Sequence, residues 1–344
     1  MGIKIKSLKI RNFRCIGSLD LDFTDPDGNP LDLVVLAGPN GCGKTSVLEA
    51  ILIACERKEM MVAWAESPLS NVKTGAENFE IRAELAVNGK LDIRKWRIYE
   101  RDRRTQKLGP MIDSELDAGS ELSYPLRDTS IEYLSSWRAP KLVASLPVAD
   151  EKKDKDEERG EADRLLALQR KCRDFWVHSS LNRHDPLLDP RVRAIVDPLE
   201  KVWGIFYPGA EAEFIVRSVS KDNPEGGVNL YLRKNGSTEI PVNDLSSGEI
   251  EVLTMAGWFT MNDYKGGIVL IDEPELHMHE EWHCAIMRAL RVLLPETQIV
   301  VATHSAEILD SVMSYELFWL LHEGDPRLGP NDKPVIRDRP EHND

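Results

Sequence analysis

The chain has 344 residues, with 44 lysines and arginines against 58 aspartates and glutamates, and therefore a formal charge of −14. At about 150 residues per domain, this length predicts roughly two domains. A content of 42% apolar and 30% charged residues is that of an ordinary globular protein, which excludes a collagen-like, a wholly disordered or a membrane-embedded chain. The acidic balance argues against a protein coated with basic charge for gripping nucleic acid, although a local basic strip remains open.

Five cysteines are scattered along the chain, at positions 15, 42, 55, 172 and 284. They form no C-x-x-C pair, so the usual zinc and dithiol redox spacings are absent. The opening residues lack the uninterrupted apolar segment of a signal peptide, and no window approaches 18 apolar residues. We expect reduced thiols, no membrane partner and a cytoplasmic protein.

The first elements predict a strand, turn and helix unit. Residues 3–9 and 19–23 alternate apolar and polar side chains, as half-exposed strands do, and the turn-rich sequence DPDGNP at 25–30 closes this N-terminal β element. LDLVVLA at 31–37 is the continuous apolar run of a buried strand. A glycine-rich turn follows, and residues 45–57 carry apolar side chains at helical spacing. This order is typical of a nucleotide-binding βα unit.

A second β region follows. Residues 79–100 alternate on both sides of the turn NGK, which predicts a β-hairpin. Between Arg94 and Lys107 there are seven basic residues against two acidic ones, so the end of this hairpin forms a basic ribbon.

The middle and the end of the chain are more polar. Residues 149–164 are almost wholly charged, which predicts a solvated loop, with a partner-binding tract as the alternative. Helices are predicted over about 161–181 and 190–204, and residues 321–344 are expected to form a proline-containing tail.

The most specific motif is GPNGCGKT at residues 38–45, a full match to G-x-x-x-x-G-K-[ST]. Its glycines let backbone N–H groups turn inward around phosphate oxygens. Lys44 would reach the β- and γ-phosphates of a nucleotide, and Thr45 would place its hydroxyl on Mg²⁺. The motif follows a predicted buried strand and opens a helix, as such a loop requires. The expected phosphate-binding residues are Gly38, Pro39, Asn40, Gly41, Cys42, Gly43, Lys44, Thr45 and Ser46.

Two later strands end in polar residues. GGIVLIDEPE at 266–275 leads from an apolar run into Asp272 and Glu273, which suits a Mg²⁺-organising aspartate followed by a base that activates water. The strand QIVVATHS at 298–305 ends in His304, at the carboxyl edge where sheet proteins bind ligands. Taken alone, His304 reads equally well as a hydrogen-bonded surface histidine.

The sequence DLSSGE at 244–249 precedes a helical apolar pattern and has two readings. Ser246, Ser247 and Gly248 would offer backbone N–H groups and a hydroxyl to a phosphate. Taken alone, the sequence favours the second interpretation, in which Ser246 or Ser247 is a plain N-cap and Glu249 completes a capping box.

These four motifs, in this order, resemble those of ABC-type ATPase heads of the RecF/SMC/OLD-like branch. GPNGCGKT looks like Walker A, LSSGE like the signature, IVLIDEPE like Walker B, and ATHS like the switch-histidine loop. The opening KIKSLKIRNFRCI resembles the branch's N-terminal strand with its NFR segment, which makes Arg14 a candidate nucleotide contact. YLSSWRAP at 133–140 loosely resembles another strand end of stand-alone members. The likeness covers residues 1–58 and 240–312.

The resemblance implies an α/β P-loop fold with an N-terminal antiparallel element and a mixed helix and hairpin insertion between Walker A and the signature. It also implies a head that dimerises face to face around two ATP molecules with Mg²⁺. Lys44 and Thr45 of one subunit would face Ser246 and Gly248 of the other, while Glu273 polarises water and His304 senses the γ-phosphate. We expect head lobes at 1–140 and 205–320, an insertion at 141–204 and a tail at 321–344.

Two features depart from the family pattern, and a third competes with it. The signature has Ser247 where the family has glycine, and neither Gln106 nor Gln169 makes a convincing glutamine loop. His279 and His283 belong to the zinc-protease pattern H-E-x-x-H with Glu280 as base, but we favour a helix-surface or interface role there.

The kind of ATPase is narrowed by what the sequence lacks. The stretch between the motifs has no sustained heptads, unlike long-armed chromosome proteins. The 40 residues after His304 are too few for a nuclease domain. We therefore expect a compact ATPase that dimerises and regulates a separate effector. The resemblance to short AAA-type ATPases of bacterial antiphage defence operons implies that this effector is a nuclease or a similar enzyme acting in antiphage defence. The alternatives are a RecF-like repair ATPase and a binding platform whose ATP site is structural.

The charge is unevenly distributed. Residues 244–281 hold nine acids against one base, whereas residues 1–14 carry five cations and no acid. Any nucleic acid is therefore expected at the strip from Lys4 to Arg14 or at the 94–107 ribbon, and a protein partner at the acidic side. The cations of the strip are Lys4, Lys6, Lys9, Arg11 and Arg14.

Overall fold

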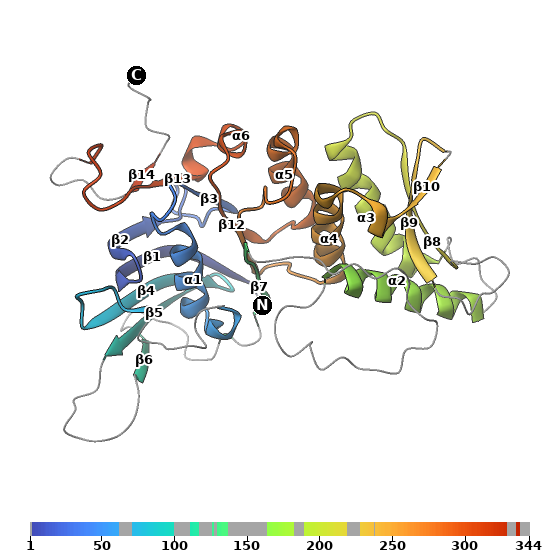
Figure 1. Cartoon of the computed structure of the whole chain (residues 1–344). Helices are drawn as coiled ribbons and strands as arrows, with labels where there is room; N and C mark the ends of the chain where they lie inside the picture. Colours follow the sequence, from blue (N-terminus) through green and yellow to red (C-terminus); the bar gives the residue numbers. More distant parts are fainter. Residues whose placement is uncertain are drawn as a thin grey trace. The chain divides into compact units, whose positions relative to one another are not determined.

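The computed structural model forms two compact units (Figure 1). The first contains residues 1–136, 264–274 and 296–344, and the second contains residues 137–263 and 275–295. The structure describes residues 2–61, 71–99, 111–116, 126, 129–136, 164–181, 189–218, 228–236, 238–328 and 335–337. Gln106, the charged loop as far as residue 163, the far end of the basic ribbon, residues 137–140 and most of the tail lie outside these ranges.

The first unit contains an antiparallel sheet in the order β2-β1-β4-β5-β6. In β4, every second side chain is buried, as expected for a sheet with one covered face. Asn88 and Gly89 both have positive φ, as the tight turn between β4 and β5 requires. The predicted hairpin at 79–100 is therefore confirmed. The strands are β1 (Ile3–Phe13), β2 (Ile16–Asp22), β4 (Asn78–Val87), β5 (Lys90–Tyr99) and β6 (Met111–Leu116).

A second sheet of the first unit runs in the order β14-β13-β3-β12-β11-β7 and is parallel except at β14. All five residues of β3, β11 and β12 are buried, which explains why they read as continuous apolar runs. The strands are β3 (Leu33–Ala37), β7 (Ile131–Leu134), β11 (Ile268–Asp272), β12 (Gln298–Ala302), β13 (Leu317–Leu320) and β14 (Val335–Arg337).

Helix α1 (Lys44–Ala54) packs against strands of both sheets. Every residue of α1 except Thr45 is buried, so the helix is covered around its whole circumference. Edge-on ring pairs Phe13–Phe79 and Phe23–Phe318 fill the same core. A short helix α6 (Ala306–Asp310) follows β12. The predicted βα unit is thus held rigidly by the core of the first unit.

Among its described residues, the second unit packs four helices with a three-stranded sheet in the order β10-β9-β8. The helices predicted near 161–181 and 190–204 are present, and Asp189 caps the second by accepting the Arg191 N–H at 2.8 Å. The three strands of this sheet were not predicted. The elements are α2 (Arg164–Leu181), α3 (Pro190–Phe206), β8 (Ala212–Ser218), β9 (Val228–Lys234), β10 (Thr238–Pro241), α4 (Ser247–Met261) and α5 (Glu280–Leu293).

The compact units divide the chain differently from the predicted lobes. Residues 205–263 and 275–295 belong with the helical segment, because β8, β9 and α4 pack on α2 and α3. The lobes at 1–140 and 205–320 remain a prediction about function, since they follow the motifs and not the packing. Within the part of the chain that the structure describes, no helix has the length and apolar character needed to cross a membrane.

Candidate functional site

The loop between β3 and α1 depends on glycine at two positions. Gly38 has φ +137°, and a Cβ there would lie 2.2 Å from the Leu320 carbonyl oxygen. Gly43 has φ +106°, and a Cβ there would lie 2.8 Å from Ile16 Cγ1. Other residues would be strained at both angles and would also clash. The glycines therefore shape the loop as the phosphate-binding motif predicts.

Lys44 lies at the start of α1 and is only 8% exposed. Its ammonium donates to the carbonyl oxygens of Gly38 at 2.8 Å and of Pro39 at 3.2 Å. These bonds fold the lysine back across the loop, where its positive charge meets the N-terminus of the helix. Cation and helix N-terminus together favour an anion at this place.

Thr45 joins the loop to the Walker B strand. Its hydroxyl donates to Asp272 Oδ2 at 2.9 Å, and the Asp272 carboxyl is buried at the end of β11. Among the residues described, no cluster of three histidine, cysteine or carboxylate side chains could hold a metal ion alone. A hydroxyl and one carboxylate fit Mg²⁺, which binds oxygen and shares its ligands with substrate phosphates. Thr45 and Asp272 would therefore hold it together with a nucleotide.

Glu273 and His304 follow neighbouring parallel strands and meet at the same sheet edge. The Glu273 backbone has φ +51°, uncommon for a residue with a side chain, and its N–H donates to the Ala302 carbonyl at 2.8 Å. His304 Nδ1 lies 3.8 Å from Glu273 Oε1, and His304 is 55% exposed. A carboxylate and an imidazole are thus presented to solvent beside the buried Asp272. The first unit therefore brings together Lys44, Thr45, Asp272, Glu273 and His304.

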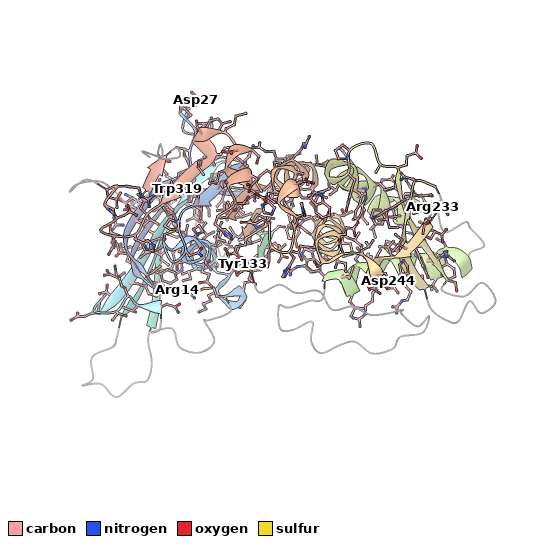
Figure 2. The ribbon with its side chains drawn as sticks, turned by 45° about the horizontal axis from the view of Figure 1, so that its top comes forward. Arg14, Asp27, Tyr133, Arg233, Asp244 and Trp319 are labelled. Atoms are coloured by element: carbon pink, nitrogen blue, oxygen red, sulfur yellow. The ribbon has the colours of Figure 1, made fainter. Side chains whose placement is uncertain are left out.

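Arg14, labelled in Figure 2, is partly buried, with 21% of its side chain exposed. Its guanidinium pairs with the buried Glu49 of α1, and Nε donates to Asn71 Oδ1 at 2.9 Å. Burial lowers the pKa of Arg14. Arg14 fixes the turn between β1 and β2 to the phosphate-loop helix, and its contact with a nucleotide remains a prediction.

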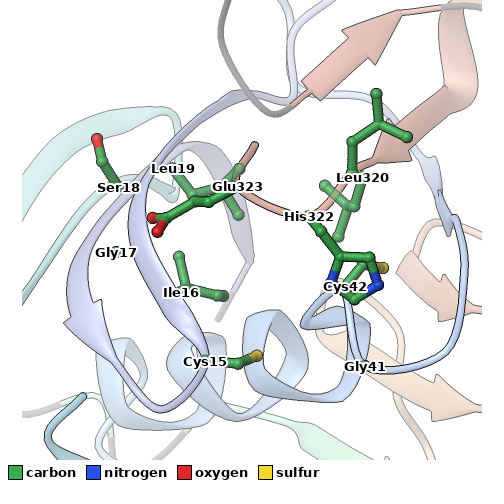
Figure 3. A pocket seen from close by; sticks show the side chains of 11 residues that line it. Cys15, Ile16, Gly17, Ser18, Leu19, Gly41, Cys42, Leu320, His322 and Glu323 are labelled. Atoms are coloured by element: carbon green, nitrogen blue, oxygen red, sulfur yellow. The ribbon is translucent and has the colours of Figure 1, made fainter. Parts of the chain in front are cut away.

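A cavity of about 60 Å³ opens beside the phosphate loop (Figure 3). Its rim includes His322 and Glu323 from the segment after β13, which sequence reasoning missed because the residues of this segment match no motif. Glu323 pairs with Lys73 at 2.6 Å, and this bond lowers the pKa of the Glu323 carboxyl. The lining residues are Cys15, Ile16, Gly17, Ser18, Leu19, Gly41, Cys42, Leu320, Leu321, His322 and Glu323.

The signature residues lie in the second unit, at the start of α4. Ser246 is the N-cap, and both its N–H and its hydroxyl donate to Glu249 Oε2, at 2.9 and 2.8 Å. The predicted capping box is confirmed. A Cβ on Gly248 would lie 2.9 Å from the His277 carbonyl oxygen and 3.2 Å from Trp282 Cζ3. Close packing is therefore enough to explain the glycine at position 248. A phosphate-binding role for Ser246, Ser247 and Gly248 remains a prediction.

Two doubtful motifs are settled by local geometry. His279 precedes α5 and caps it, so His279 and His283 do not both project from helical turns as a zinc-protease pair would. Gln169 is buried and donates to Asn229 and Asn243, which is a structural role.

β7 pairs with β11 so that Leu134 lies opposite Ile271. Ser135 therefore follows β7 at the same sheet edge where Asp272 ends β11. The resemblance of residues 133–140 to a strand end agrees with the end of β7 at Leu134, but the pairing of β7 with β11 could not be read from the sequence.

Comparison with known proteins agrees with this geometry. The family model described as "AAA domain, putative AbiEii toxin, Type IV TA system" matches residues 33–310. The chain is 34% identical over 123 residues to "Retron Vc95 probable ATPase" of Vibrio cholerae, covering 31% of this chain and 23% of that protein. It is also 34% identical over 64 residues to "Septu protein PtuA" of Bacillus thuringiensis, covering 19% of this chain and 16% of that protein.

The chain thus matches well under two thirds of the length of these relatives. Among solved structures, the SMC head domain from Thermotoga maritima matches with a TM-score of 0.53 and 14% identity, covering 98% of this chain and 99% of that one. This likeness shows an SMC-head-like α/β fold.

Proposed function

Because the chain belongs to the AAA domain family described as "AAA domain, putative AbiEii toxin, Type IV TA system", we propose that it binds and hydrolyses ATP with Mg²⁺. The observation that carries the proposal is the hydrogen bond from Thr45 to Asp272, 2.9 Å long. It joins the phosphate loop to the end of β11 and leaves oxygen ligands for a cation beside the ammonium of Lys44. A P-loop ATPase needs this arrangement.

The roles of the side chains follow from their places. Lys44 would move from the loop carbonyls to the β- and γ-phosphates, and Thr45 and Asp272 would hold Mg²⁺, which offsets charge on the phosphate oxygens. Glu273 is partly exposed at the same edge, where it would accept a proton from the attacking water. His304 would hold that carboxylate in place and contact the γ-phosphate.

The site within one chain is incomplete, and a second copy would complete it. Ser246 and Gly248 lie at a helix N-terminus in the second unit, where a phosphate bound to another subunit could be received. ATP would then couple directly to head-to-head dimerisation, because each nucleotide contacts both subunits.

We further propose that this ATPase acts in bacterial antiphage defence and controls a separately encoded effector such as a nuclease. The support is the similarity to a retron ATPase and to a Septu protein. A nuclease encoded beside the chain should bind it when the two are co-expressed, and ATP should change its cutting rate. Effector binding and a cutting rate that do not change with ATP would contradict this role.

The alternative, a repair ATPase that holds DNA, receives less support from the N-terminal strip. Three of its five cations are paired within the chain: Lys4 with Asp32, Arg11 with Asp20, and Arg14 with Glu49. DNA binding that falls steeply between about 50 and 200 mM salt would favour this alternative.

The ATPase proposal is tested with three variants of the chain. Lys44→Ala should abolish ATP binding, because it removes the ammonium beside the phosphates. Glu273→Gln should retain ATP binding, lower hydrolysis by about 10²- to 10⁴-fold and accumulate ATP-bound dimers in analytical ultracentrifugation. Glu280→Gln, at an exposed glutamate in the first turn of α5, is the matched control and should hydrolyse ATP normally.

Unchanged hydrolysis by Glu273→Gln would contradict the base assignment. Failure of the wild-type chain to bind ATP would contradict the proposed function as a whole.

A further inference from the structure

The signature helix carries an acid where an anion is expected to bind. Glu249 lies in the first turn of α4, and its carboxylate accepts two hydrogen bonds from Ser246 within 2.9 Å. A lone carboxylate so close to the helix N-terminus would repel a phosphate. Something must offset that charge if this end of the helix is to receive ATP.

Two donors from other elements offset it. Lys234, the last residue of β9, places its ammonium 2.7 Å from Glu249 Oε1, and the Tyr207 hydroxyl donates to the same oxygen at 2.8 Å. The Glu249 side chain is 10% exposed, whereas Lys234 is 36% exposed. The carboxylate is thus screened on one oxygen by a cation and a phenol, and Ser246 uses the other.

Aromatic rings hold these donors in place. Tyr207 stacks on Trp203 with ring centroids 5.0 Å apart, and Trp282 meets Tyr207 edge-on at 5.2 Å. The Lys234 ammonium lies 5.6 Å from the Trp203 ring and 5.5 Å from the Tyr207 ring, so it also gains cation–π attraction. Trp282 also lies close to Gly248, where a Cβ would be 3.2 Å from Trp282 Cζ3. The whole cluster surrounds the signature.

The charge state of the cluster is well defined. Burial acts to raise the pKa of Glu249, but the hydrogen bonds from Lys234, Ser246 and Tyr207 lower it to about 2. Burial and the nearby Glu249 carboxylate both raise the pKa of Tyr207. Glu249 is therefore ionised and Tyr207 neutral throughout the physiological range, and Lys234 supplies the positive charge.

We propose that Lys234 is a positioning residue of the signature, which neutralises Glu249 so that Ser246 and the N–H groups of α4 can receive a nucleotide phosphate held by a second copy of the chain. This inference rests on the proposed ATP-driven dimer. It adds the residue in β9 that makes an acidic signature compatible with an anionic ligand, and the motif itself does not identify that residue.

The experiment measures two affinities in chains that also carry Glu273→Gln, which prevents turnover. One is the affinity of a single chain for a fluorescent ATP analogue, and the other is the ATP-dependent dimer dissociation constant from analytical ultracentrifugation. Lys234→Met should weaken the dimer about tenfold or more, the cost of losing one charged hydrogen bond, and leave nucleotide affinity unchanged. Lys234→Arg keeps the charge and should stay within about threefold of the parent chain.

The matched control is Arg233→Met, on the neighbouring residue of β9 (Figure 2). Arg233 pairs with Glu213 at 2.5 Å and with Glu239 at 2.8 Å, away from Glu249. The substitution removes a cation of the same strand without changing the signature. The dimer dissociation constant of this variant should therefore match that of the parent chain. Circular dichroism checks that each variant is folded.

The decisive variant combines Lys234→Met with Glu249→Gln. Glutamine keeps the capping box but needs no counter-charge, so this double change should restore the dimer to within about threefold of the parent chain. Glu249→Gln alone should dimerise at least as well as the parent. Dimerisation by Lys234→Met equal to that of Arg233→Met, or no rescue by Glu249→Gln, would overturn the inference.

Loss of dimerisation already in the parent chain would overturn the proposed dimer together with this inference. A parent chain that dimerises normally beside an unaffected Lys234→Met would overturn the inference alone.

Discussion

A single buried amide joins the two sheets of the first unit, and its removal should be costly. Gln298, the first residue of β12, is fully buried. Its Oε1 accepts the Ile5 N–H at 2.6 Å, and its Nε2 donates to the carbonyl oxygens of Ile5 at 3.0 Å and Leu31 at 2.9 Å. Gln298→Met keeps the size and the unbranched shape of the side chain while removing all three bonds.

The magnitude follows from the groups left behind. The substitution leaves one buried N–H and two buried carbonyl groups without this partner, and each unsatisfied group costs about 1 to 3 kcal/mol. Burial of the more apolar methionine side chain offsets part of this free-energy cost. We therefore expect a loss of roughly 3 to 6 kcal/mol from the free energy of unfolding of the first unit.

Native-state amide exchange is the suitable assay, because a chain with two compact units need not unfold in one step. Gln298→Met should lower the protection of β1 and β12 amides, with the Ile5 N–H most affected. Thr297→Val is the matched control, since it removes a buried hydroxyl that donates to the Tyr264 carbonyl at 2.9 Å, on the residue next to Gln298. A loss below about 1 kcal/mol for Gln298→Met, or one no larger than for Thr297→Val, would refute the reasoning.

Three further predictions concern the site and its surroundings. Gly38→Ala should abolish ATP binding, because a Cβ would strike a backbone carbonyl, whereas Gly28→Ala, with nothing within 4 Å of its Cβ, should retain it; a fluorescent ATP analogue measures both. Cys15 is exposed and lines the cavity at the phosphate loop, so Mg-ATP should slow its alkylation in mass spectrometry but leave that of the exposed Cys284 unchanged, and equal slowing of both would count against the site. The pKa of Glu249 is lowered to about 2 in the folded chain, so its stabilising effect is complete above its unfolded value of about 4.3 and is lost as the pH falls toward 2. Urea midpoints should therefore fall less steeply with acid in Glu249→Gln, and parallel curves would argue against this pKa.

Local chemistry explains what the sequence could predict. The runs in β3, β11 and β12 are buried on both faces and so read as continuous apolar segments, and the capping box at Ser246 is complete within four residues. The phosphate loop is equally local, since its glycine angles and its lysine contacts all lie between Gly38 and Lys44.

Features that depend on distant pairing could not be read from the sequence. Arg14, in the turn between β1 and β2, pairs with Glu49 of α1, and Glu323 reaches the cavity only because β13 pairs with β3. The sheet of β8 to β10 was also missed, because its short strands are interrupted by charged residues and by segments without a strand pattern. The role of Lys234 was missed for the same reason, because it depends on the ion pair with Glu249 on another element.

The strand order of the parallel sheet fixes the order in which the protein can fold during synthesis. The phosphate loop leaves the ribosome with β3, but its neighbours β12 and β13 begin only at Gln298 and Leu317. The antiparallel sheet, by contrast, is complete at Leu116 and pairs mainly neighbouring segments. Because non-local parallel pairing is slow, the nascent chain should carry a folded β platform and an unsupported glycine loop until β12 and β13 have been synthesised. The proposed nucleotide site is therefore formed only after β12 and β13 have paired with β3.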